Sequence, residues 1–282
     1  MSGICSSNSN SLVEGFIAIL IIGIPILAIV FGVGSVFYDI GKFAYDKVVD
    51  AIAIMKPLHP KRKAILNKYF FYYRQLSRQD QKKFEERVNR FLYSKNFIGR
   101  SIEVTDEMKV LISATAILLT FGLPMITLAH FDKILMYPDE YYSRINRSYH
   151  LGEVNPRLGI IILSWRHFVE GFVDNQDGRN LAFHEMAHAV HFENQIRNEE
   201  YDFLDSDMLS HWDKLAAQEI ENIRSNADHF LRDYAGTNQH EFFAVAVEYF
   251  FESGELFREQ LPRLYKTMVL LLNQDPVKLF KL

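Results

Sequence analysis

The stretch 180–194, NLAFHEMAHAVHFEN, contains two histidines four positions apart with a glutamate beside the first: His184, Glu185 and His188. On an α-helix, residues four apart lie on one face, so both imidazoles can point at one metal ion. In zinc peptidases with this pattern the glutamate is not a ligand but the general base for the water that attacks the scissile carbonyl. The pattern therefore predicts a metallopeptidase, a hydrolase with one Zn²⁺ per chain.

An ordinary amphipathic helix can also carry such a pentapeptide, because short motifs produce false positives. The neighbours of the polar trio are apolar, namely Phe183, Met186, Ala187 and Val190. They place two histidines and an acid next to a core, where a buried polar cluster needs partners or a metal. The context therefore favours a metal site.

The third ligand must come from elsewhere in the chain. Metalloproteases with a longer single motif place a glycine seven and a histidine ten residues after the first histidine, where this chain has His191 and Asn194, so that class is excluded. The single cysteine, Cys5, allows neither a thiolate zinc site nor an internal disulfide. A carboxylate from a second helix is the alternative, and YAGTNQHEFFAVAVEYFFE offers Glu241 and Glu248.

Glu241 has a competing interpretation, because Asn238 followed by Glu at the third position resembles a helix-capping pair. Against this, HEFFAVAVEYFFE is apolar on most of its surface, which indicates a buried helix with His240 and Glu241 in its first turn. A buried acid facing a histidine pair is more economically explained as a ligand, and two histidines, one glutamate and a water form a known catalytic zinc set. A purely structural zinc site without cysteine is less usual.

The motif HEMAH, followed at a distance by YAGTNQHEFFAVAVEYFF, resembles the zinc peptidases related to Mlc titration factor A, whose catalytic domain is similar to that of anthrax lethal factor. The resemblance implies a zincin-like domain with a gluzincin-like site in which His184, His188 and Glu241 bind zinc. It also implies that Glu185 is the general base and that Tyr234 stabilises the tetrahedral oxyanion. The substrate would be a peptide or a protein.

The resemblance covers roughly residues 58–275, with VTDEMKVLISATAILLTFGL, ILMYPDEY and GIIILSW in the same order. It implies that GIIILSW is the strand beside the cleft, where a substrate backbone can pair with its edge. The family commonly has an aspartate where this chain has His191, which could be a partner of a ligand, an accidental ligand or, as we favour, a surface residue. Glu248 either orients a motif histidine or is an acid on the helix surface.

A regulatory protein is the opposing interpretation. The founding relatives are associated with binding a sugar-responsive transcription repressor, and a zincin domain can serve as a scaffold for a protein partner with little or no catalysis. A pure scaffold could lose Glu185 or Tyr234, and this chain retains both. We therefore expect an enzyme.

The composition supports one substantial folded domain. The chain has 282 residues, 49% of them hydrophobic, and a net charge of −4, which provides no basic field for nucleic acid. The short apolar runs 133–138 and 159–165 predict strands, and helices dominate from Asn180 to the end. We expect an α+β, mainly helical fold, with a zincin-like peptidase domain and a small sheet over 58–282, after a juxtamembrane linker over 39–57.

The amino-terminal region predicts a membrane anchor. Residues 16–38 run without a charge, which is enough to span a bilayer core of ~30 Å. No basic residue precedes Lys42, so the basic region of a cleaved signal peptide is missing. We expect a polar leader over 1–14 and a retained transmembrane helix over 15–38. The lysines after it predict a single-pass membrane protein with a cytoplasmic catalytic domain.

The second apolar stretch, 110–131, is also long enough to be read as a membrane span. Three hydroxyl residues dilute it, and Gly122 with Pro124 ends it after about three turns. We therefore expect a buried core helix here.

Overall fold

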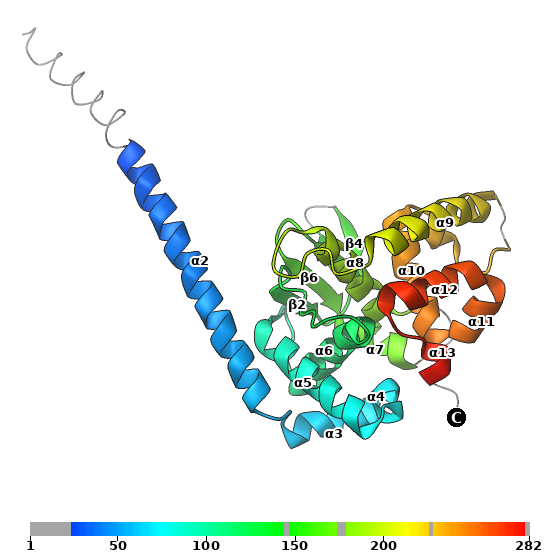
Figure 1. Ribbon diagram of the computed structural model, residues 1–282, viewed down its shortest axis with the longest axis horizontal. Coiled ribbons are helices and arrows are strands. Elements are labelled where there is room, and N and C mark those ends of the chain that lie inside the picture. Colours follow the sequence, from blue (N-terminus) through cyan, green and yellow to red (C-terminus); the bar gives the residue numbers. More distant parts are fainter. Residues whose placement is uncertain (1–23, 144–146, 174–178, 226–227, 280–282) are drawn as a thin grey trace, which may run out of the picture. The chain divides into compact units, whose positions relative to one another are not determined.

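The computed structural model describes residues 24–143, 147–173, 179–225 and 228–279. By its internal contacts the chain divides into two units, Met1–Ile52 and Ala53–Leu282. Figure 1 shows the helices and strands in chain order.

The first helix in the described part of the chain, α2 (Ile24–Met55), runs unbroken for 32 residues. Its apolar part ends at Tyr38, because Asp39 and further charged residues follow in the same helix. Among the described residues, no helix is both long and apolar enough to cross a membrane. This finding overturns the predicted single-pass membrane location and leaves the transmembrane helix over 15–38 without support. The described part of the uncharged run, from Ile24 to Tyr38, continues into charged residues within one helix. The predicted leader and the start of that helix, residues 1–23, lie outside the described residues.

Helices make up most of the second unit, as expected for a mainly helical α+β fold. Those before and within the sheet region are α3 (Pro60–Tyr69), α4 (Phe71–Gln75), α5 (Arg78–Ser94), α6 (Asp106–Thr120) and α7 (Trp165–Val173). Those that follow are α8 (Leu181–Gln195), α9 (Ser206–Ser225), the 3-10 helix η2 (Asp233–Gly236), α10 (Gln239–Glu252), α11 (Gly254–Gln260), α12 (Pro262–Leu272) and α13 (Pro276–Leu279).

The sheet has four strands in the order β1-β2-β6-β5. They are β1 (Asn96–Gly99), β2 (Lys133–Tyr137), β6 (Ile160–Ser164) and β5 (Gly152–Asn155). The first three run parallel, whereas β5 pairs antiparallel with β6. A separate hairpin pairs β3 (Tyr141–Ser143) with β4 (Ser148–His150).

The strands predicted over 133–138 and 159–165 are confirmed as β2 and β6. The expectation that GIIILSW forms the edge beside the cleft is wrong, because β6 lies between β2 and β5. The edge belongs to β5 instead. Its sequence, GEVN, has no apolar run, so hydrophobic patterning could not reveal it.

The apolar stretch after Thr105 is confirmed as a core helix, α6. Its first turn is capped by the Thr105 hydroxyl, which accepts a hydrogen bond from the Met108 N–H at 3.2 Å. The hydroxyls of Ser113, Thr115 and Thr120 each donate to the carbonyl four residues earlier. Because these hydroxyls are satisfied within the helix, α6 can be buried on nearly all sides.

Two helices position the site. α8 packs against α10, α6 and the strands β5 and β6. Small residues such as Ala187 and Ala189 allow close approach, and larger ones such as Phe183 fill the gaps, with its ring centroid 5.5 Å from that of Phe251 on α10. α10 therefore packs directly against the motif helix, α8 (Figure 1).

Candidate metal centre

The motif helix begins at a heavily bonded residue, Asn180. Its side-chain oxygen accepts from the Phe183 N–H at 3.1 Å and so caps the helix. Its side-chain nitrogen donates to the Gly171 carbonyl on α7 at 2.7 Å and to Glu252 on α10 at 2.8 Å. The start of α8 is therefore fixed to both neighbouring helices.

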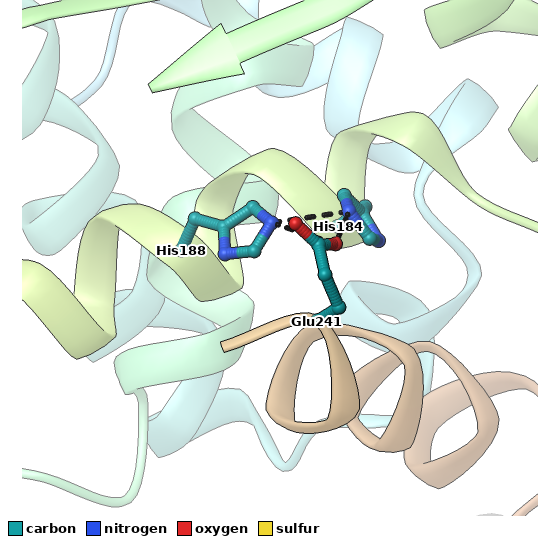
Figure 2. Close-up of side chains that lie close together, drawn as sticks. All are labelled: His184, His188 and Glu241. Carbon is teal, nitrogen blue, oxygen red and sulfur yellow. Dashed lines mark hydrogen bonds and ion pairs between the residues drawn. The ribbon is translucent and has the colours of Figure 1, made fainter. Parts of the chain in front are cut away.

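Three side chains converge between α8 and α10. Figure 2 shows Glu241 reaching from the first turn of α10 toward His184 and His188 on α8. Glu241 Oε2 lies 3.1 Å from His184 Nε2 and 3.4 Å from His188 Nε2, and the two nitrogens are 3.1 Å apart. The capping role considered for Glu241 falls to Asn238, whose side chain accepts from the His240 and Glu241 N–H groups.

These distances fit a shared metal ion. Ligand atoms at 2.0–2.1 Å from a tetrahedral zinc ion are separated from one another by about 3.3 Å. The three separations here are 3.1, 3.1 and 3.4 Å. Two imidazole nitrogens with one carboxylate oxygen are a donor set suited to zinc, and three protein ligands leave a fourth position open.

Glu248 fixes the orientation of the first histidine. This carboxylate is 1% exposed, and its Oε1 accepts from His184 Nδ1 at 2.8 Å. It also accepts from the Asn180 N–H at 2.6 Å and from both terminal nitrogens of Arg232, at 2.6 and 3.1 Å. With Nδ1 bonded to Glu248, the Nε2 atom of His184 faces Glu241, as a metal ligand requires. Of the two interpretations of Glu248, the structure supports the orienting one.

The contacts between α8 and α10 set the protonation states of His184 and Glu241. Burial lowers the pKa of His184, but hydrogen bonds to Glu241 and Glu248 outweigh it and raise that pKa to about 10. Burial raises the pKa of Glu241, and its contacts with His184 and His188 reverse this and hold it well below the usual range. His184 is therefore protonated at neutral pH, and a metal ion must displace that proton.

Glu185 lies against the edge strand. It is 6% exposed, and burial raises its pKa. A Cβ atom added at Gly152, the first residue of β5, would lie 2.6 Å from the Cγ and Oε1 atoms of Glu185. The edge strand can approach the motif glutamate this closely only because residue 152 has no side chain.

Tyr234 is carried by η2 and faces the same centre. Its ring centroid lies 5.9 Å from that of His184, and the side chain is half exposed. Burial, followed by the charge of Glu241 and a hydrogen bond to it, raises the pKa of Tyr234 to about 12. The phenol therefore keeps its proton at neutral pH.

Two hollows meet at this centre, with volumes of about 630 and 310 Å³. Both are lined by His150, Gly152, His184, Glu185 and Tyr234. His184, Glu185 and Tyr234 thus line both hollows, whereas His188 and Glu241 line only the smaller one.

His191 is buried, so its interpretation as a surface residue is wrong. It is 7% exposed, and its ring centroid lies 4.9 Å from that of His240 and 5.1 Å from that of Phe243. Its Nδ1 atom is buried without a hydrogen-bond partner. Burial, with the nearby charges of His240 and His188, lowers its pKa to about 4. The signal was in the sequence, because position 191 lies seven residues after His184 and so on the same helical face.

Sequence reasoning missed Asn180, Gly152 and Arg232. Asn180 stands immediately before the motif helix and is a preferred capping residue, so it could have been found. Arg232 stands two residues before Tyr234, but nothing in the sequence pairs it with Glu248. The role of Gly152 depends on the register between β5 and β6 and on the packing of α8, which no local pattern reveals.

Comparison with known proteins agrees with this geometry. Residues 47–272 match the family described as glucose-regulated metallo-peptidase M90. The chain belongs to this family. It is 31% identical over 229 residues to an uncharacterised protein of Synechocystis sp., covering 76% of this chain and 83% of the relative. It is 28% and 29% identical to the Mlc titration factor A proteins of Enterobacter sp. and Cronobacter sakazakii, over 72% of this chain and 82% of each relative. The resemblance to that group is confirmed.

Proposed function

We propose that this chain is a zinc-dependent peptidase. The observation that carries the proposal is the convergence of His184, His188 and Glu241 within 3.4 Å of one another, with Glu185 and Tyr234 at the same centre. The first three residues would hold the ion. Zinc bound there supplies a Lewis acid that polarises the scissile carbonyl and makes water easier to deprotonate.

Glu185 and Tyr234 would act on the reacting atoms, the first by proton transfer and the second by stabilising negative charge. Glu185 accepts the proton of the attacking water and passes it to the leaving amine, and its burial gives the carboxylate a higher proton affinity than an exposed glutamate has. Tyr234 keeps its proton and donates a hydrogen bond to the oxygen that becomes negative in the transition state. Glu248 holds His184 in place throughout.

A polypeptide is the substrate class that the surroundings suit. β5 is bonded to β6 along one edge, and its Gly152 end lies beside Glu185. An extended peptide that adds to the other edge of β5 would carry its backbone past Glu185 and Tyr234. The hollows on both sides of the centre give room for residues before and after the scissile bond.

Zinc content and turnover of the full chain test this proposal. The parent is expected to bind one zinc per chain, Glu241→Ala to lose most of it, and Glu259→Ala, at an exposed position on α11, to bind as the parent does. Glu185→Gln is expected to keep zinc and to lose peptidase turnover by ~10²-fold or more. A folded parent that binds no zinc, or a Glu185→Gln variant that cleaves peptides at the parental rate, would refute the assignment.

A regulatory role is the second candidate, and the names of the relatives favour it. Two of them are called titration factors for Mlc, which points to a protein partner. If this chain acts in that way, purified Mlc should bind the parent and Glu185→Gln with equal affinity in calorimetry. If the parent hydrolyses peptides but does not bind Mlc, the regulatory role is refuted and only the peptidase function remains.

A further inference from the structure

Arg232 contacts Glu248, which orients His184, and it also borders η2, the turn that carries Tyr234. Its guanidinium forms a two-pronged ion pair with the buried carboxylate of Glu248, through Nη2 to Oε1 at 2.6 Å and Nη1 to Oε2 at 3.1 Å. Through Glu248 it is one step from His184. Such paired contacts fix geometry as well as charge, because the planar guanidinium matches the carboxylate.

The backbone of Arg232 belongs to the turn that carries Tyr234. Arg232 is the residue before η2, and its carbonyl accepts from the Ala235 N–H at 2.9 Å. The Tyr234 carbonyl in turn accepts from the Thr237 N–H at 3.1 Å. One residue therefore holds the ligand-orienting carboxylate with its side chain and begins the tyrosine turn with its main chain.

A second arginine holds the far end of the same turn. Arg224 on α9 donates to the Gly236 carbonyl at 2.8 Å and to the Thr237 carbonyl at 3.1 Å. It contacts this turn only after Tyr234, and its other hydrogen bond is to Glu221 on its own helix, α9. Arg224 therefore offers a matched comparison, because it steadies the turn without touching Glu248.

We propose that Arg232 is a positioning residue that couples the orientation of His184 to the position of Tyr234. Glu248 is buried, so removal of its guanidinium partner leaves a carboxylate that relaxes toward other donors and no longer holds His184 rigidly. The same removal frees the start of η2. The consequence for turnover rests on the proposed peptidase function, whereas the coupling itself does not.

The test compares Arg232→Met, Arg232→Lys and Arg224→Met in the full chain. Arg232→Met is expected to weaken zinc binding by ~10–100-fold, the usual cost of losing a partner of a ligand. It is also expected to speed hydrogen exchange of the Ala235 and Thr237 amides. Arg232→Lys keeps the charge without the fork and is expected to recover part of both effects. Arg224→Met is expected to speed exchange of the turn while zinc affinity stays at the parental value.

Double substitution distinguishes coupling from simple loss of stability. In a Glu248→Gln background, Arg232→Met should have little further effect on zinc affinity, since residues of one network are not additive. If peptides are hydrolysed, Arg232→Met should lower kcat with KM nearly unchanged, and this loss should shrink in a Tyr234→Phe background.

Unchanged zinc affinity in Arg232→Met, or unchanged exchange of the turn, would overturn the coupling. So would full additivity with Glu248→Gln. A parent that binds zinc but never hydrolyses a peptide would count against the proposed function alone, because zinc affinity and exchange need no turnover.

Discussion

Helix α8 carries two buried histidines, His184 and His191, whose surroundings differ. His184, near the start, has a carboxylate against each ring nitrogen, and its pKa is raised to about 10. His191, two turns later on the same face, has a buried Nδ1 without a hydrogen-bond partner, and its pKa is lowered to about 4. Both residues are buried, with exposures of 8% and 7%, so burial alone does not distinguish them.

The difference comes from α10. Its acids, Glu241 and Glu248, face the first half of α8, whereas His240 and Phe243 face the second half. A buried imidazole between carboxylates is held in one orientation and keeps its proton, whereas one between an aromatic ring and another histidine stays neutral and serves as packing. The candidate metal centre is therefore defined by where the acids of α10 lie as much as by the motif on α8.

Among substitutions that test the contrast between His184 and His191, removal of Glu248 should lower the stability of the chain most. Glu248→Ala leaves the His184 imidazolium and the Arg232 guanidinium without their shared anion. We expect the free energy of unfolding, measured with urea at neutral pH, to fall by about 3–5 kcal/mol, as when one partner of a buried pair is deleted. A fall below about 1 kcal/mol would show that solvent screens the pair as it does on a surface. His191→Ala, at the unsupported end, should cost less.

The next largest expected effect is the change of the zinc dissociation constant with pH. Because the pKa of His184 is about 10, this residue carries a proton at neutral pH that zinc must displace. Release of one proton makes the zinc dissociation constant fall about tenfold for each unit of rising pH below that pKa. Calorimetry in buffers with different ionisation enthalpies counts the protons released. A dissociation constant that does not change between about pH 6 and pH 8 would contradict the assigned protonation.

The smallest expected effect is at the other end of the helix. His191→Phe keeps a ring against Phe243 and removes the unpartnered nitrogen, so we expect the free energy of unfolding to rise by about 1 kcal/mol. The pKa of His191 is lower in the folded chain, so the unfolded chain binds more protons and stability falls as the pH drops from about 6.5 toward 4.

The His191→Phe variant should lack this part of the acid sensitivity, which urea titrations at neutral and mildly acidic pH can measure. His211→Phe, at an exposed position on α9, is the control. Equal acid sensitivity in the parent and His191→Phe would mean that His191 finds a partner in solution.

The grouping of the three candidate ligands was largely predictable, because it follows from local sequence patterns. Four-residue spacing places His184 and His188 on one face, and the apolar sequence around Glu241 indicates a buried acid. The distances agree with both inferences, and the histidines are buried, but Glu241 itself is only partly buried. The arrangement around these residues was not predictable, since the Arg232–Glu248 pair joins side chains whose sequence types also occur on any solvated surface.

The sheet and the amino terminus show two other limits of sequence reasoning. β5 is only four residues long and partly exposed throughout, so it lacks the alternation by which strands are recognised. The membrane prediction failed for a different reason. The uncharged run was read as a separate element, but in the described residues it continues into charged turns of one helix, α2.

The candidate ligands also lie far apart in the sequence, so an ion bound by them would close a loop of the chain. His184 and Glu241 are 57 positions apart, and the intervening segment must fold back before the two can meet. Closing such a loop costs conformational entropy that grows slowly with its length. An ion shared by α8 and α10 would close this loop only in the folded chain. Unlike a disulfide, it would leave on unfolding, so it would stabilise the fold through its preference for the folded state. Chelation would then open this loop, about a quarter of the unit Ala53–Leu282, and remove the chemistry of the ion as well.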